Sequence, residues 1–202
     1  MESIEQINLI GLNNYFRELN NIYNNNKLPN KIILSGKKGI GKSVLSFHFV
    51  NFILSAKEEN KYDITNNKIN NFNRSYSLIL NNTHPNFFYI KKKIDKKSIE
   101  ISKIRELKNF VNKSSFNNNL KIVMIDDSEF LSNESGNSLL KLIEEPNSNV
   151  QFILIRDNSK YILETIKSRC IEFNIILEKK YNEEIVDNYF KKKIFYKIPN
   201  SF

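Results

Sequence analysis

The sequence predicts an α/β fold with a five-stranded, mostly parallel sheet flanked by helices. Short apolar runs that are typical of buried strands alternate with longer segments whose apolar residues recur at helical spacing. A glycine-rich loop also lies between the first such run and the helix after it. This order indicates βαβ units joined by right-handed crossovers. We expect residues 1–175 to form this core and residues 176–202 to form a basic helical tail.

The first half of the chain begins with a predicted helix over 7–24, whose apolar residues lie on one face. Pro29 blocks its continuation. An apolar run at 32–34 predicts the first strand, and apolar residues at helical spacing predict a helix over 43–54. Residues 57–75 are polar, rich in asparagine and without periodicity, so we expect a long surface loop there.

Strands and helices continue to alternate in the second half. Apolar runs predict strands at 87–90, 122–125, 152–155 and 171–175. Helices are predicted over 99–111, 132–145 and 161–167, and a tail helix over 179–193. The stretch 132–135 is typical of the start of the second of these helices, and Pro146 ends it.

Composition limits the class of protein. A chain of 202 residues with 40% hydrophobic residues is expected to fold as one domain with a substantial core. The single cysteine, Cys170, excludes an internal disulfide and a multi-cysteine zinc site. No apolar stretch could span a membrane, and the first residues lack the features of a signal peptide, so we expect a cytoplasmic protein.

The net charge of +9 has two explanations. A basic chain is attracted to nucleic acid. The chain is also crowded with Asn, Ile and Lys, which are residues of adenine- and thymine-rich codons, and such a coding bias produces a basic balance by itself. Charge alone therefore does not decide between them.

The glycine-rich loop matches the phosphate-binding pattern G-x-x-x-x-G-K-[ST]. Its glycines allow backbone N–H groups to approach phosphate oxygens, and the following helix adds partial positive charge. The lysine would reach the β- and γ-phosphates, and the serine hydroxyl would bind Mg²⁺. The alternatives are a chance turn, or a loop that binds no nucleotide or binds it without hydrolysis. The candidate residues are Gly36, Gly39, Gly41, Lys42 and Ser43.

An acidic pair, Asp126 and Asp127, follows the strand predicted at 122–125. Because ligands of parallel sheets bind beyond the carboxyl ends of strands, this pair and the phosphate loop should share one edge. Asp126 is the candidate for Mg²⁺, which prefers oxygen ligands. Asp127 could polarise an attacking water, although it is one methylene shorter than glutamate, which weakens the case for hydrolysis. The alternative is an ordinary boundary between strand and loop.

Three further places carry candidate site residues. Asn158, near Arg156, could sense the γ-phosphate or be a polar residue at a strand end. The run 91–93 of lysines could contact phosphates or be solvated. Arg169, ahead of the last strand, could stabilise transition-state charge on the nucleotide of a neighbouring subunit, as arginine fingers do.

Several segments together resemble the delta prime subunits of the bacterial DNA polymerase III clamp loader, a family of AAA+ proteins. The most specific are L-L-K-x-x-E-E-P within 139–146 and S-R-C at 168–170. The resemblance covers about residues 5–175. Its other segments are 28–36, the phosphate loop, 83–86, 101–107 and 125–129.

The resemblance implies an AAA+ P-loop NTPase core within a ring of subunits that loads the sliding clamp onto primer-template DNA. It implies ATP and Mg²⁺ as cofactors, and the gamma or tau and delta subunits as partners. Lys42 and Ser43 fall on the nucleotide loop, Asp126 on the acid beside Mg²⁺, and Arg169 on the finger presented to a neighbouring ATPase. Delta prime subunits often do not hydrolyse ATP themselves.

Three departures from the family pattern qualify these expectations. Residues 57–82 lack the cysteines of the family's zinc module, so no zinc is expected. The G-K-S loop is complete, which favours nucleotide binding. The chain ends soon after Arg169, so we expect the lid and collar domains to be mostly absent, either in a reduced protein or in a truncated product, and residues 176–202 to be a remnant of the lid. The alternative functions are a self-sufficient AAA+ ATPase or a basic DNA-binding module.

Overall fold

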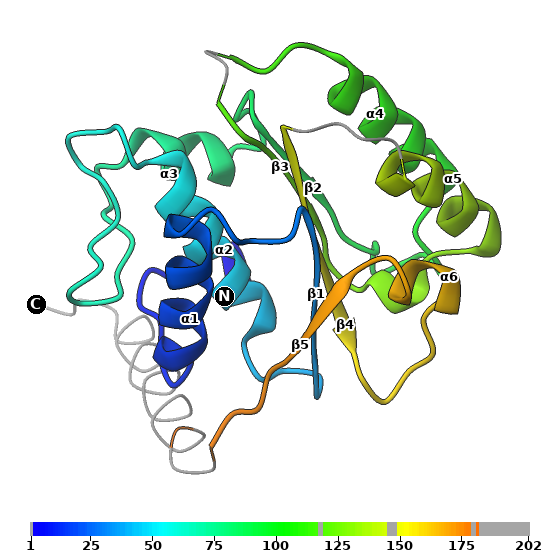
Figure 1. The fold of residues 1–202 in the computed structure, drawn as a ribbon, viewed down its shortest axis with the longest axis horizontal. Helices are drawn as coiled ribbons and strands as arrows, with labels where there is room; N and C mark the ends of the chain where they lie inside the picture. Colours follow the sequence, from blue (N-terminus) through cyan, green and yellow to red (C-terminus); the bar gives the residue numbers. More distant parts are fainter. Residues whose placement is uncertain (1, 117–118, 145–148, 179–180, 182–202) are drawn as a thin grey trace, which may run out of the picture.

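A computed structural model describes residues 2–116, 119–144, 149–178 and 181 as one central sheet with helices on both faces (Figure 1). The strands are β1 (Lys31–Gly36), β2 (Phe87–Ile90), β3 (Lys121–Ile125), β4 (Val150–Asp157) and β5 (Ile171–Asn174). The helices are α1 (Asn13–Asn24), α2 (Lys42–Leu54), α3 (Arg74–Leu80), α4 (Ile101–Asn112), α5 (Asn133–Glu144) and α6 (Glu164–Lys167), with 3₁₀ turns η1 (Ser3–Glu5) and η3 (Ser128–Phe130).

The sheet has five strands in the order β2-β3-β4-β1-β5, and every pairing in it is parallel. All five carboxyl ends therefore lie along one edge. Strand β1 lies between the middle strand β4 and the outer strand β5, which places the loop after Gly36 on that edge beside the carboxyl end of β4. The prediction of a five-stranded, parallel α/β fold is confirmed.

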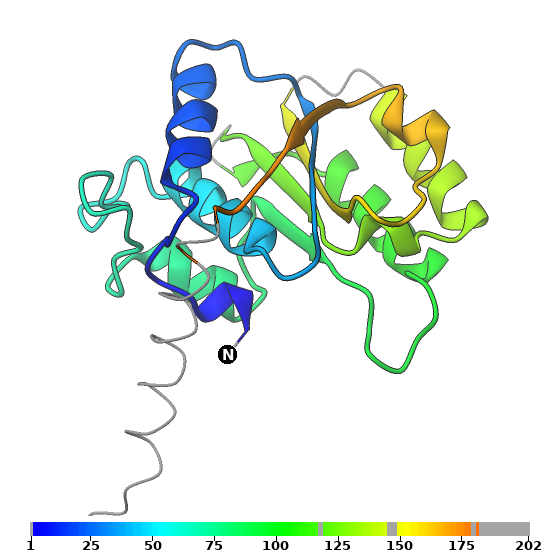
Figure 2. The ribbon, with the colours of Figure 1, turned by 90° about the horizontal axis from the view of Figure 1, so that it is seen from below.

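Two helical layers enclose the sheet. Helices α1, α2 and α3 cover one face, and α4, α5 and α6 cover the other (Figures 1 and 2). Helix α2 lies between the sheet and α1, so it is buried on several sides, and its apolar residues form no single stripe. Strands β1, β3 and β4 are almost wholly buried, as their continuous apolar runs predict.

Helix α1 begins at Asn13, six residues later than predicted. Residues 7–12 instead run extended beside the segment after α2. The carbonyl of Ile7 accepts from the N–H of Ile69 at 2.9 Å, and the N–H of Leu9 donates to the carbonyl of Asn67 at 3.1 Å. Gly11, at φ +73°, then turns the chain into the helix. Pairing between distant segments therefore replaces the helix that local periodicity favours.

The surface loop predicted at 57–75 is partly a core segment. Tyr62 and Ile69 are 3% and 1% exposed and pack into the cluster around α1 and α2. Helix α3 was not predicted; Asn73 caps it by accepting from the N–H of Tyr76 at 2.8 Å. Isolated apolar residues among many asparagines anchor this segment without producing a periodic pattern.

Some predictions fall outside the described residues. The tail helix over 179–193 does so except for Tyr181, and the last residue of the helix predicted over 132–145, with Pro146, does so as well. Within the described part of the chain, the helices are all too short or too polar to cross a bilayer.

The buried imidazole of His48 on α2 predicts a loss of stability as the pH falls. Its Nε2 lies 3.0 Å from the carbonyl oxygen of Gln6, and its Nδ1 lies 2.8 Å from the hydroxyl of Tyr62. Burial lowers the pKa of His48 from 6.5 to about 4. Between these two values the unfolded chain binds more protons than the folded one, so the free energy of unfolding decreases as the pH is lowered through that window.

Urea unfolding of the parent and of His48→Gln at about pH 7 and about pH 5 measures this effect. We expect the parent to lose about 2 kcal/mol more than the variant between the two pH values. The other histidine, His84, whose pKa burial also lowers, is unchanged in both proteins, so the difference isolates His48. Equal losses in the two proteins would contradict the assignment.

Candidate nucleotide-binding site

The loop between β1 and α2 has a backbone that only glycine adopts readily. Gly39 and Gly41 have φ values of +85° and +91°. Gly41 is the residue before the first turn of α2, and no side chain caps that turn. The first N–H groups of a helix have no partner within the helix, so the end of α2 presents free donors to an anion.

Lys42 and Ser43 open helix α2 beside this loop. Lys42 is 7% exposed, and its ammonium donates to the carbonyls of Gly36 at 2.9 Å and Lys37 at 2.7 Å. Burial lowers the pKa of Lys42, while nearby carboxylates, Asp157 first among them, oppose that shift. The ammonium is thus held over the loop at the point where the phosphate chain would lie.

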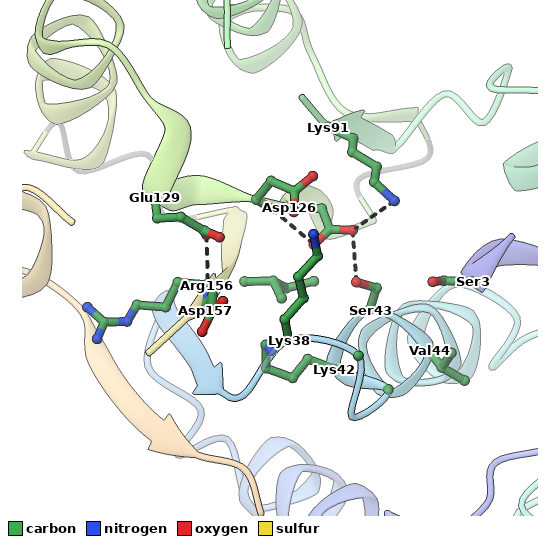
Figure 3. A pocket seen from close by; sticks show the side chains of 14 residues that line it. Ser3, Lys38, Lys42, Ser43, Val44, Lys91, Asp126, Glu129, Arg156 and Asp157 are labelled. Atoms are coloured by element: carbon green, nitrogen blue, oxygen red, sulfur yellow. Dashed lines mark hydrogen bonds and ion pairs between the residues drawn. The ribbon is translucent and has the colours of Figure 1, made fainter. Parts of the chain in front are cut away.

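Asp126 follows β3 and faces the loop across the sheet edge (Figure 3). Its Oδ2 accepts from the hydroxyl of Ser43 at 2.8 Å and from the hydroxyl of Tyr89 at 3.3 Å. The same oxygen lies 3.7 Å from the ammonium of Lys91. Hydroxyl and carboxylate oxygens are the protein ligands that Mg²⁺ prefers when it also binds a phosphate.

Asp127 and Glu129 add acidic groups to the same edge. Asp127 has a left-handed backbone with φ +56°, which is uncommon for a residue other than glycine. Burial and the adjacent Asp126 raise the pKa of Asp127, and burial raises that of Glu129. The carboxylate of Glu129 accepts from the N–H of Asp157 at 3.2 Å, which ties η3 to the end of β4.

These groups line one pocket of about 270 Å³. Both carboxylates and lysines line it, and no three described His, Cys, Asp or Glu side chains are arranged to hold a metal by themselves. Mg²⁺ in such sites is held by one or two protein oxygens together with phosphates, which fits this arrangement. The lining residues are Ser3, Lys38, Gly39, Gly41, Lys42, Ser43, Val44, Lys91, Asp126, Asp127, Glu129, Ile155, Arg156 and Asp157.

The structure brings most of the predicted site residues together. Gly39, Gly41, Lys42, Ser43, Asp126 and Asp127 all line the pocket, and Gly36 lies beneath it as an acceptor for Lys42.

Asn158 and Arg169 lie elsewhere. The side chain of Asn158 is exposed and not part of the lining, although its N–H donates to Gly36 at 3.2 Å. Arg169 precedes β5, whose first residue pairs with Ile32 near the start of β1, so Arg169 lies toward the opposite edge of the sheet. There it contacts Glu144 at 2.5 Å and the carbonyl of Thr165 at 2.9 Å.

Sequence reasoning left out several lining residues, chiefly Ser3, Lys38, Glu129 and Asp157. Lys38 belongs to the x positions of the loop motif, which the pattern leaves open. Asp157 is the last residue of β4, and that strand runs two residues further than predicted. Arg156 lines the pocket, but its guanidinium points away from Lys42 (Figure 3), and its Nε lies 3.6 Å from Glu172 of β5.

Comparison with known proteins shows to which family the chain belongs. Residues 11–178 match the family model described as DNA polymerase III, delta subunit. The match covers most of the chain and includes the loop, both acids and Arg169.

Two curated relatives and one solved structure illustrate the similarity. The DNA polymerase III subunit delta' of Pseudomonas aeruginosa is 29% identical over 140 residues, covering 69% of this chain and 41% of the relative. That of Buchnera aphidicola subsp. Baizongia pistaciae is 32% identical over 157 residues, covering 74% and 45%. The chain therefore spans less than half the length of these relatives.

The crystal structure of a DNA polymerase III gamma subunit-related protein from Thermotoga maritima superposes with a TM-score of 0.54. It is 21% identical in sequence, and the match covers 86% of this chain and 48% of that one. At this level of identity the likeness concerns the fold alone.

Proposed function

The chain belongs to the DNA polymerase III delta-subunit family, and we propose that it is a nucleotide-binding subunit of a clamp loader in DNA replication. In this role it works beside gamma or tau and delta subunits, in a complex that places a sliding clamp on primer-template DNA. Such a role implies a cytoplasmic location. The family and the site geometry support this proposal together.

The observation that supports nucleotide binding is that three groups lie together where the parallel strands end. Lys42 lies over the loop, the first turn of α2 has no side-chain cap, and the hydroxyl of Ser43 contacts Asp126 at 2.8 Å. These donors and oxygens match ATP with Mg²⁺. The bound ion would supply charge neutralisation of the phosphates. Asp127 would orient a water. A role of Asn158 as sensor of the γ-phosphate would require its exposed side chain to turn into the pocket, which it does not line.

Arg169 is the residue through which this chain would act on a neighbouring subunit. Because Arg169 lies toward the edge opposite the pocket, it would act on a nucleotide bound by an adjacent subunit. We therefore propose a subunit whose main contributions are nucleotide binding and this arginine, with little ATP turnover of its own.

A co-purification experiment tests the proposal. The tagged chain is mixed with DNA polymerase III gamma and delta subunits and labelled ATP, with Mg²⁺ present, and retained proteins and label are measured. We expect gamma and delta to be retained and the label to co-purify. An unrelated P-loop protein on the same resin is the control. Retention equal to that control, together with no bound ATP, would refute the proposal.

A further inference from the structure

Lys91 is placed in the nucleotide pocket by the pairing of two strands. The register of β2 with β3 ends at Ile90 opposite Ile125, so the next residues on the two strands are Lys91 and Asp126. The N–H of Asp126 donates to the carbonyl of Ile90 at 2.8 Å, which holds this register at the strand ends. Lys91 therefore occupies a built position beside the acid and is not part of a free loop.

The side chain of Lys91 extends toward the corner where Ser43 and Asp126 meet (Figure 3). Its Nζ lies 3.7 Å from the same Asp126 oxygen that accepts from Ser43. Half of its side-chain surface remains exposed, which leaves the ammonium free to turn toward a ligand. Among ion pairs of the described residues, Asp126 is its partner.

The two lysines that follow differ from Lys91. Lys92 lies over the ring of Phe130 and donates to the carbonyls of Lys93 and Lys96 at 3.1 and 3.0 Å, so it is bound to its own loop. Lys93 is exposed and does not line the pocket. Of this run, only Lys91 lines the pocket, so the run as a whole is not a phosphate-binding patch.

We infer that Lys91 is a phosphate contact for a nucleoside triphosphate at the corner assigned to Mg²⁺, where it supplies part of the charge neutralisation when no divalent cation is bound. The inference rests on the proposed nucleotide binding. Without Mg²⁺, the phosphate chain carries more negative charge and faces Asp126 and Asp127. An ammonium beside these carboxylates offsets that repulsion, and Mg²⁺ makes the contribution largely redundant.

Calorimetric titration of ATP into the parent chain and Lys91→Met, each with saturating Mg²⁺ and with a chelator, tests the inference. In the chelator we expect Lys91→Met to weaken binding about tenfold, the size of one charge-assisted contact. With Mg²⁺ we expect a loss of about twofold or less, because the divalent ion dominates the local charge. Lys91→Arg should retain the parent affinity in both conditions.

Lys93→Met is the matched control, because it removes the same formal charge two residues away and outside the pocket. A loss in the chelator shared by Lys91→Met and Lys93→Met would show a general charge effect and overturn the inference. An equal loss with and without Mg²⁺, or no loss, would overturn it as well. In each of these outcomes, ATP binding by the parent chain with or without Mg²⁺ would still support the proposed function. If the parent bound no ATP at all, the proposed function and this inference would both fail.

Discussion

Replacing Lys42 with alanine is expected to weaken ATP binding by on the order of 100-fold. The ammonium of Lys42 is buried over the loop and already donates to two carbonyls, so it is oriented before any ligand arrives. A charge-assisted hydrogen bond contributes about 1.5–3 kcal/mol, so two such contacts to phosphate oxygens, each at the low end of this range, account for the expected loss. Calorimetric titration with Mg²⁺ present measures it.

Lys37→Ala is the matched control for this experiment. The side chain of Lys37 is exposed and outside the pocket, whereas its carbonyl, which the substitution keeps, accepts from Lys42. We expect this variant to bind ATP within about threefold of the parent, because only a distant charge is lost. Thermal unfolding of all three proteins shows whether the loop still folds. Parent-like affinity in a folded Lys42→Ala protein would contradict the assignment of the pocket.

The sequence predicts the part of the site that is local. The strand, loop and helix around Lys42 follow one another directly, so spacing alone identifies them. The prediction that the acid pair shares this edge depends on one general property of parallel sheets, which is that the carboxyl ends of their strands lie together. The structure confirms that Asp126 and Ser43 come within 2.8 Å of each other.

Other parts of the site depend on strand order and strand length. Lys91 and Asp126 become neighbours only because β2 pairs with β3, which the order of elements along the chain does not determine. Residues 155–157 at the end of β4 line the pocket, whereas Asn158, the first residue after the strand, does not. A difference of two residues in the predicted end of β4 therefore changes which side chain enters the site.

The segment after α2 shows a different limit. Two of its buried residues, Tyr62 and Ile69, are seven residues apart and lie between polar neighbours, so no periodicity identifies them. Tyr62 packs beside His48 of α2, and the N–H of Ile69 binds the carbonyl of Ile7. Contacts of this kind between distant segments can be found only in three dimensions.

Arg169→Ala is expected to lower ATP turnover by the assembled loader at the adjacent site by about 10³-fold or more, the range known for arginine fingers. The ATP affinity of this chain should not change. Arg169 lies just before β5, and Gly36 ends β1 four residues beyond Ile32, the partner of the first residue of β5. At about 3.3 Å per residue, that places about 13 Å of strand between Arg169 and the chain's own pocket.

Arg169 also forms an ion pair with Glu144, so the experiment must distinguish the loss of the finger from the loss of this ion pair. Their side chains are 40% and 49% exposed, and exposed pairs contribute about 1 kcal/mol or less. Arg169 can therefore leave Glu144 for a phosphate at little cost. Glu144→Gln removes the same contact but keeps the guanidinium, so the loader carrying it should retain its ATP turnover. If both variants lowered turnover equally, the ion pair and not the finger would be the functional element, because only Arg169→Ala removes the charge that a neighbouring nucleotide would meet.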